Sequence, residues 1–207
     1  VDGILQRLQV DYLDSLLLHR PDALMEADQV AEAFDILQKS GKVRDFGVSN
    51  QNPMMMELLK REVKQSLLIN QLQLSAAFTP GFDAGFHVNM EGDKAAVRDG
   101  SVFEYCKLND MVIQAWSVLQ FGYFKGNFVG NEQFQQLNQV LNRLALKYGV
   151  SPSAIAIAWV LRYPARMQAV VGTTNPKHLL EASKASNLTL TRKEWYEIYL
   201  AAGNDLP

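Results

Sequence analysis

Five short apolar runs alternate with segments of helical periodicity, and this alternation constrains the fold more than any other feature of the chain. The runs are Leu13–Leu18, Val43–Val48, Leu67–Leu72, Met111–Trp116 and Met167–Val171. Most of them do not alternate between polar and apolar residues, which is typical of parallel strands buried on both faces. Intervening helices supply the crossovers that parallel strands need. The pattern predicts an α/β fold with a parallel sheet covered by helices.

Cap residues set the boundaries of the expected helices. Each of Asn52-Pro53, Ser151-Pro152 and Asn175-Pro176 reads as an N-cap followed by proline at the first helical position. Asp28 is expected to cap a helix over 29–40, which Gly41 ends. Thr191 and Glu194 have the spacing of a capping box. Further helices are expected over 53–61, 102–109, 132–148 and 152–162.

The segment Ser75–Gly100 is expected to be a long loop that acts as a lid. Its phenylalanines at 78, 82 and 86 have helical spacing, but Pro80, Gly81 and Gly85 favour local turns instead. Because no linker, repeat or low-complexity tract interrupts the chain, residues 1–207 are expected to form a single domain.

Charge and composition exclude several classes of function. With 20 basic and 22 acidic residues, the chain lacks the basic field that nucleic-acid binding needs. No apolar run reaches the roughly 18 residues of a membrane span, and the N-terminus does not resemble a secretory signal. Cys106 is the single cysteine, and the three histidines lack metal-ligand spacing. The expectation is a cytoplasmic protein with no metal site, no nucleic-acid partner and no membrane partner.

Polar or aromatic residues follow every predicted strand, where parallel α/β sheets bind ligands. In chain order they are His19, then Ser49 and Asn50, then 70–73, then Trp116 and Ser117, then 172–175. Taken singly, His19 fits a satisfied buried histidine, Trp116 fits core packing, and Ser117 and Thr173 fit helix caps. Together they suit a flat heteroaromatic ring linked to phosphates. The common glycine-rich nucleotide fingerprints are absent from the sequence.

Five motifs in order resemble the second half of an aldo-keto reductase. They are LDSLLLHRPD (13–22), GKVRDFGVSN (41–50), INQLQLS (69–75), VIQAWSVLQFG (112–122) and VVGTTNPKHLLEA (170–182). The C-terminal LTLTRKEWYEIYLAAGNDLP is similar to the ending of a bacterial subgroup of this family. The resemblance implies a (β/α)8 TIM-barrel type of fold, and an NAD(P)H-dependent oxidoreductase that reduces aldehydes or ketones to alcohols by hydride transfer.

The resemblance implies catalytic and cofactor roles for individual residues. His19 matches the catalytic histidine, which hydrogen-bonds the substrate carbonyl. Ser49, Asn50 and Gln71 match the residues that bind the nicotinamide carboxamide, and Trp116 matches the aromatic residue that stacks on the ring. The remaining matches are Ser117 and Leu119 at the pyrophosphate, Gly172, Thr173 and Thr174 at the adenosine phosphate end, His178 near the 2′-phosphate, and Glu181 at adenine. NADP(H) is therefore the expected cofactor, with NAD(H) as the alternative because only Lys177 and His178 are basic within 172–178.

The same resemblance implies that three βα units of the barrel are missing from this chain. Such a barrel has about 250 residues and eight strands, whereas about five strands are predicted here. The missing units would hold the family's catalytic aspartate, tyrosine and lysine. The chain is expected to be the C-terminal portion of a longer enzyme for a small carbonyl substrate, and inactive or impaired by itself. The alternatives are a non-catalytic nicotinamide-nucleotide-binding or regulatory module, and a barrel enzyme of another chemistry such as a phosphate-binding lyase. Oligomeric state is left open.

Overall fold

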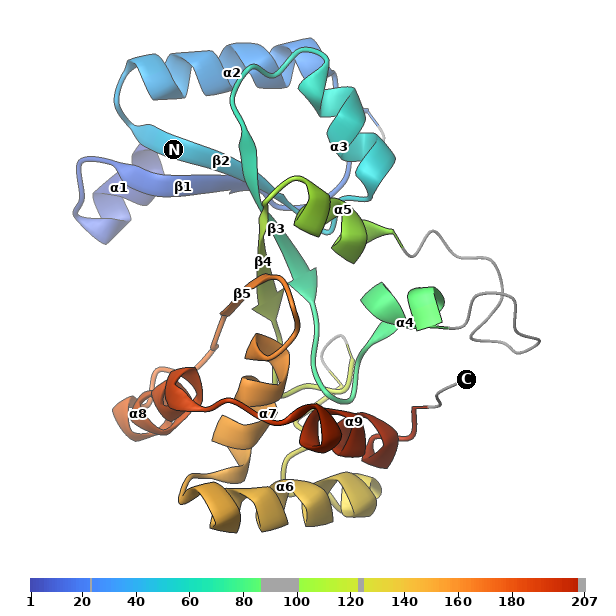
Figure 1. The fold of residues 1–207 in the computed structure, drawn as a ribbon. Helices are drawn as coiled ribbons and strands as arrows, with labels where there is room; N and C mark the ends of the chain where they lie inside the picture. Colours follow the sequence, from blue (N-terminus) through green and yellow to red (C-terminus); the bar gives the residue numbers. More distant parts are fainter. Residues whose placement is uncertain (23, 87–100, 123–124, 205–207) are drawn as a thin grey trace.

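A computed structural model describes residues 1–22, 24–86, 101–122, 125–204 of the chain, with side chains 84–86 excepted. Within these residues the strands form one parallel sheet of five, in the order β1-β2-β3-β4-β5 (Figure 1). The strands are β1 (Leu13–Leu18), β2 (Val43–Ser49), β3 (Leu67–Gln73), β4 (Val112–Trp116) and β5 (Arg166–Ala169). The predicted α/β fold with about five parallel strands is confirmed, and it is an incomplete barrel of the (β/α)8 type.

Helices connect successive strands and cover the outer face of the sheet. They are α1 (Asp2–Leu8), α2 (Ala27–Lys39), α3 (Pro53–Lys60), α4 (Pro80–Phe86), α5 (Val102–Leu108), α6 (Gln135–Tyr148), α7 (Pro152–Leu161), α8 (Pro176–Ser183) and α9 (Arg192–Ala201), with the 3-10 turns η2 (Glu132–Phe134) and η3 (Lys184–Asn187). Helix α2 packs on β2 and α3, α5 packs on β4, and α7 packs on β5, α6 and α8. This covering layer explains why Ile113 and Ala115 of β4 are completely buried.

The predicted helix caps are largely confirmed. The side chains of Asn52, Ser151 and Asn175 accept hydrogen bonds from the backbone amides of the helices they precede, and proline follows each of them. Thr191 and Glu194 form the expected capping box. The prediction for Asp28 was wrong. Helix α2 begins at Ala27 with Glu26 in the cap position, and Asp28 lies in its first turn, where a negative charge interacts favourably with the helix dipole.

The prediction of a loop throughout Ser75–Gly100 was also wrong, because α4 lies within it. Pro80 occupies the start of the helix, where its missing N–H costs no hydrogen bond. Gly81 serves close packing, since a Cβ there would lie 2.3 Å from the Cε2 atom of Phe103. The signals that argued against a helix therefore reflect its start and its contact with α5. Residues 87–100 of the expected lid lie outside the described residues.

An aromatic core fills the space between α4, α7 and α9. The indole N–H of Trp159 donates to the carbonyl of Trp195 at 2.9 Å, and the indole N–H of Trp195 donates to the carbonyl of Trp159 at 3.0 Å. Their rings stack with centroids 4.8 Å apart, and Phe82 and Tyr199 pack beside them. Both indoles thus bury large apolar areas while keeping their polar atom satisfied.

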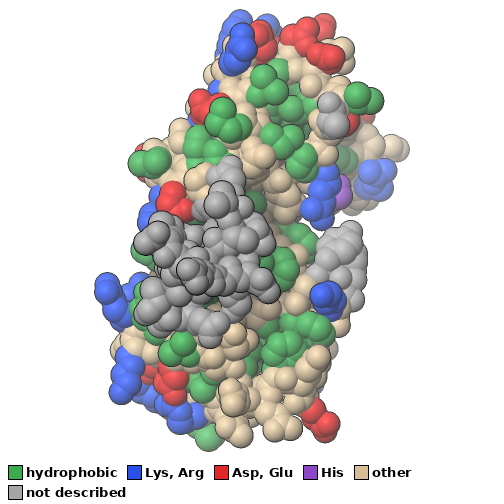
Figure 2. Space-filling model, turned by 90° about the vertical axis from the view of Figure 1, so that its right-hand side faces the viewer, with side chains coloured by type: hydrophobic (Ala, Val, Ile, Leu, Met, Phe, Trp, Pro, Cys, Tyr) green, Lys and Arg blue, Asp and Glu red, His purple; other side chains and the backbone are tan. Residues whose placement is uncertain are grey.

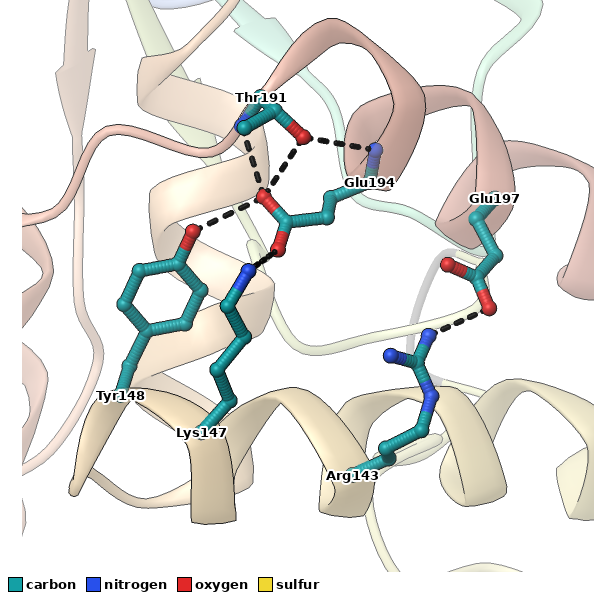
Figure 3. Close-up of polar contacts among 6 residues, drawn as sticks. All are labelled: Arg143, Lys147, Tyr148, Thr191, Glu194 and Glu197. Carbon is teal, nitrogen blue, oxygen red and sulfur yellow. Dashed lines mark hydrogen bonds and ion pairs between the residues drawn. The ribbon is translucent and has the colours of Figure 1, made fainter.

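Glu194 joins α9 to α6 through a cluster of polar contacts (Figure 3). Its carboxylate accepts hydrogen bonds from Lys147 Nζ at 2.6 Å, Tyr148 Oη at 2.9 Å, and the Thr191 backbone and hydroxyl at 2.8 Å. Burial raises the pKa of Glu194, but the bonds from Lys147, Thr191 and Tyr148 outweigh burial and lower this pKa to about 2. Its neighbour Glu197 pairs with Arg143 in a more exposed setting.

The surface shown in Figure 2 carries acidic and basic side chains at both ends of the molecule, with hydrophobic side chains between them. The two signs of charge are mixed across this face outside the undescribed residues. Among the described helices, none is long and apolar enough to cross a membrane by itself; Glu132–Tyr148 and Pro152–Leu161 meet that test of length and composition only as a pair bent by 94°.

Candidate functional site

The candidate site lies at the carboxyl ends of the strands, on the inner face of the sheet. Register partners place Ser49 beside Gln71, Gln71 beside Gln114, and Gln114 beside Gln168, so these side chains lie in one row across β2 to β5. Leu18 pairs with Val48, so His19 follows β1 next to Ser49 at the same level. The row is polar throughout, whereas the adjacent residues that point to the opposite face, Val48, Asn70 and Ile113, are completely buried.

Close packing of β2 on β3 brings Ser49 and Gln71 together. A Cβ at Gly47 would lie 2.6 Å from the Ile69 carbonyl oxygen, so only glycine permits this approach. The Ser49 hydroxyl then donates to the Gln71 carbonyl at 3.0 Å, and the Asn50 backbone N–H donates to the same oxygen at 2.9 Å. Asn50 has a φ of 54°, a left-handed conformation that asparagine tolerates better than most residues. Its Nδ2 donates to the Ser49 hydroxyl at 2.8 Å.

Trp116, the last residue of β4, contributes to two cavities. The larger, with a volume of about 620 Å³, lies between the loop after β4, the start of α7 and the segment from Val170 into α8. The smaller, about 520 Å³, lies between Trp116, Asn50 and the aromatic residues Phe78 and Phe103. An aromatic ring shared by two adjoining cavities suits a flat ligand group that continues from one cavity into the other.

Most of the predicted cofactor residues line the larger cavity. They are Trp116, Ser117, Leu119, Gly172, Thr173, His178 and Glu181. Ser117 has a φ of 54° and donates its hydroxyl to Gln120 Oε1 at 3.1 Å. The Thr173 hydroxyl accepts from the Asn175 backbone at 3.2 Å, and Glu181 is ion-paired to Lys184 at 2.6 Å. The structure therefore brings together residues that are separated by more than fifty positions in the sequence.

The other predicted residues lie outside that cavity. Asn50 lines the smaller cavity. Ser49 is buried and Gln71 is half-buried in the polar row, while His19 is exposed beside them. Thr174 is exposed and lines neither cavity, although it follows Thr173 directly.

Sequence reasoning assigned no role to Arg20, Gln114 or Gln168. The Arg20 guanidinium lies 5.6 Å from the centroid of the Trp116 ring, within cation–π range, and lines the smaller cavity. The amide of Gln114 bonds to Gln71 on one side and to Gln168 on the other. The spacing of Gln114 two residues before Trp116 could have placed it on the same sheet face. Its partnership with Gln168 needs the register between strands, which the sequence does not reveal.

The described residues give little support to thiol catalysis or to metal binding. Cys106 is completely buried, and burial raises the pKa of its thiol to about 11, so it is not held as a nucleophilic thiolate. No three His, Cys, Asp or Glu side chains gather there as metal ligands.

Comparison with known proteins identifies the family. The family model for the aldo/keto reductase family matches residues 1–201. The chain belongs to the aldo/keto reductase family. It is 34% identical over 208 residues to 6-dehydroglucose reductase of Agrobacterium fabrum, covering 100% of this chain and 63% of that protein. It is 35% identical over 202 residues to oxidoreductase YdhF of Escherichia coli, covering 97% of this chain and 61% of that protein. The chain therefore spans less than two thirds of the length of these relatives.

Solved aldo-keto reductases share the fold. A thermostable aldo-keto reductase in complex with the inhibitor epalrestat superposes with a TM-score of 0.73 at 21% identity, over 97% of this chain and 64% of that one. An aldo-keto reductase from Klebsiella pneumoniae in complex with NADPH gives a TM-score of 0.70 at 24% identity, over 95% and 61%. The family resemblance inferred from the five motifs is confirmed. Membership of an oxidoreductase family disfavours both the non-catalytic module and the lyase.

Proposed function

We propose that the chain carries the cofactor-binding part of a carbonyl reductase that uses NADPH and a small aldehyde or ketone. The observation that carries this proposal is the position of Trp116, which borders both cavities, shares the smaller one with Asn50, and follows Gln114, the register partner of Gln71, by two residues on β4. Two relatives are named 6-dehydroglucose reductase and glyoxal reductase, which supports the reaction class. The Klebsiella structure in complex with NADPH supports the cofactor.

The residues present fit a nicotinamide nucleotide. The Asn50 side-chain amide donates through Nδ2 to Ser49, and the Gln71 side-chain amide donates through Nε2 to Gln114. Among the described residues, no donor bonds to Asn50 Oδ1 or Gln71 Oε1. Two carbonyl oxygens suit the NH2 group of a primary carboxamide, which is a donor. When bound, NADPH would supply the hydride.

Each remaining residue has a defined task in this proposal. Trp116 stacks on the nicotinamide ring and fixes which face is presented. His19, at the end of β1, donates a hydrogen bond to the substrate carbonyl oxygen and orients it. In the larger cavity, Ser117 and Leu119 border the pyrophosphate, and Gly172, Thr173 and Thr174 border the adenosine phosphate. His178 with Lys177 faces the 2′-phosphate, and Glu181 faces adenine.

In this proposal the proton donor comes from outside residues 1–207. The resemblance places the tyrosine acid, with its lysine and aspartate, in βα units that residues 1–207 do not match. We therefore expect NADPH binding without carbonyl reduction above background. General acid catalysis is typically worth about 10²–10⁴-fold, which sets the size of the expected deficit.

The test compares residues 1–207 with a chimera. In the chimera, the part of the Agrobacterium 6-dehydroglucose reductase that this chain does not match is joined to Val1. Calorimetric titration with NADPH and NADH measures binding, and NADPH oxidation with an activated aldehyde measures turnover. Binding by both proteins and turnover by the chimera alone are expected. Failure of both proteins to bind either nucleotide would refute the proposal, and turnover by residues 1–207 alone would show that the proton donor lies within them.

His19→Ala in the chimera tests the catalytic role separately. Because His19 faces the substrate oxygen in this proposal, the substitution should lower kcat/KM strongly and leave the NADPH dissociation constant unchanged. Loss of NADPH affinity with unchanged turnover at saturation would assign His19 to the cofactor instead.

A further inference from the structure

Three glutamines form a chain of hydrogen bonds across the inner face of the sheet. Gln71, Gln114 and Gln168 are register partners on β3, β4 and β5. Gln71 Nε2 donates to Gln114 Oε1 at 3.1 Å, and Gln114 Nε2 donates to Gln168 Oε1 at 2.8 Å. We name these three side chains the glutamine row. Both bonds run in the same direction, so the row has a polarity.

The polarity fixes what the end of the row presents. The oxygen and nitrogen of a planar amide point in different directions, so holding Gln71 Nε2 against Gln114 also fixes the direction of Gln71 Oε1. Without the row, a half-buried glutamine could rotate its amide and present either atom. Directly after the neighbouring strand β2, the bond from Asn50 Nδ2 to Ser49 Oγ constrains a second amide in the same way. The site therefore presents two carbonyl oxygens.

We propose that Gln114 and Gln168 are positioning residues that hold the Gln71 amide with its oxygen toward the ligand, so that the site selects a primary carboxamide. This inference rests on the proposed function, because Gln71 is taken to bind the nicotinamide carboxamide. Neither Gln114 nor Gln168 touches the ligand; they act through Gln71. Preorganisation of this kind increases affinity, because the side-chain order is established before binding.

The alternative is that the row only stabilises the sheet. Cross-strand amide pairs contribute to strand pairing in many sheets. A purely structural row would affect every ligand equally, whereas a positioning row affects only ligands that carry the carboxamide. Two ligands that differ in this group therefore separate the two roles.

The experiment measures the affinity of the 207-residue chain for NADPH and for 2′-phospho-ADP-ribose, which has the same phosphates and adenosine but no nicotinamide. Gln114→Leu removes both bonds of the row at similar side-chain volume. It should weaken NADPH binding about three- to ten-fold, the effect of one or two neutral hydrogen bonds, and leave 2′-phospho-ADP-ribose binding unchanged. Gln168→Leu leaves the bond from Gln71 to Gln114 intact and should weaken NADPH binding less.

Gln114→Glu tests rescue, because it keeps an oxygen that accepts from Gln71 Nε2 and should restore most of the NADPH affinity. Gln65→Leu is the matched control. The Gln65 amide donates to Asp35 at 2.7 Å and to Gln38 at 3.2 Å, just before β3 begins and therefore at the opposite end of the strand. This substitution removes comparable amide bonds and should change neither affinity.

The outcomes separate this inference from the proposed function. If the unsubstituted chain does not bind NADPH, the proposed function fails and the inference fails with it. If the chain binds NADPH but Gln114→Leu weakens both ligands equally, or weakens neither, the positioning role is refuted while the proposed function stands. Should Gln114→Leu fail to fold, the two ligands are compared with Gln168→Leu, whose substitution lies at an exposed position. If Gln168→Leu then leaves the NADPH affinity unchanged, the positioning role is refuted.

Discussion

The aromatic core between α4, α7 and α9 and the polar row at the carboxyl ends of the strands both depend on side chains that hydrogen-bond between elements. In the aromatic core, Trp159 and Trp195 satisfy each other's backbone carbonyls. In the polar row and beside it, Gln71 and Asn50 each donate through their amide nitrogen to a neighbouring side chain, and no described donor reaches their amide oxygens. The hydrogen bonds of the two indoles pair the polar atom of each ring and so stabilise the fold. The two unpaired amide oxygens can instead accept hydrogen bonds from a ligand. Substitutions in the two regions should therefore have different consequences.

Trp159→Ala should have the largest effect. Trp159 is completely buried, and its removal leaves a large cavity and removes the hydrogen bond that its indole donates to the Trp195 carbonyl. Large-to-small substitutions of buried aromatic residues cost about 3–5 kcal/mol of unfolding free energy. Urea denaturation measures this loss, and Trp159→Phe should recover part of it. A loss below about 1 kcal/mol would show that the aromatic core is not a main source of stability.

The pH dependence of stability should report the Glu194 cluster. Because the folded-state pKa of Glu194 is about 2, below its ordinary value of 4.5, its contribution is present above pH 4.5. That contribution is lost as the pH falls from 4.5 towards 2, since the unfolded chain then binds the proton more readily. Glu194→Gln should lower the unfolding free energy by roughly 2 kcal/mol at pH 7 and progressively less across this interval.

Glu197→Gln provides the matched control for Glu194, one helical turn along α9 (Figure 3). Its partner Arg143 is more than half exposed, so the pair should contribute about 1 kcal/mol or less. Urea denaturation of both variants between pH 2 and pH 7 makes the comparison. Equal losses for the two variants, or a loss for Glu194→Gln that does not vary with pH, would contradict the role assigned to the Glu194 cluster.

Local signals accounted for most of what the sequence predicted correctly. The caps at Asn52, Ser151, Asn175 and Thr191 involve residues two or three positions apart, so their hydrogen bonds could be read from the sequence. The failure at Asp28 was also local, since α2 begins at Ala27 with Glu26 in the cap position. The failure within Ser75–Gly100 involves a contact between distant segments. Gly81 permits a helix because Phe103 packs against it, and nothing near Gly81 in the sequence indicates this.

In the candidate site, too, some residues could be predicted from local signals and others could not. Strand-end position identified Trp116, Asn50 and the residues around Gly172, because parallel strands present their carboxyl ends at one edge. The glutamine row escaped prediction, since Gln114 and Gln168 meet only through the register of β4 and β5. The roles of His19 and the other site residues came from the resemblance to the family, and they remain predictions.

Trp116 gives the sharpest contrast with the aromatic core, because its substitution should affect ligand binding and not stability. Stacking of a flat ring on an aromatic face is worth roughly 0.5–1.5 kcal/mol beyond area burial, so Trp116→Ala should weaken NADPH binding by about 1 kcal/mol or more. Trp116→Tyr offers the same flat face and should recover most of that loss. Because Trp116 is half-buried and borders two cavities, neither substitution should approach the stability loss of Trp159→Ala.

Measuring the melting temperature and the NADPH dissociation constant on the same proteins separates binding from packing. In the chain with all three tryptophans, energy transfer to bound NADPH should come mainly from Trp116, because transfer falls steeply with distance and only Trp116 of the three lines the cavities. Trp116→Tyr should therefore abolish most of the transfer while keeping most of the affinity. If Trp116 only filled space, both substitutions would lower the melting temperature and the folded proteins would bind NADPH as before. Unchanged NADPH affinity in folded Trp116→Ala would show that Trp116 does not stack on the nicotinamide. The amides of Asn50 and Gln71 would then be the only remaining support for a nicotinamide site beside β4.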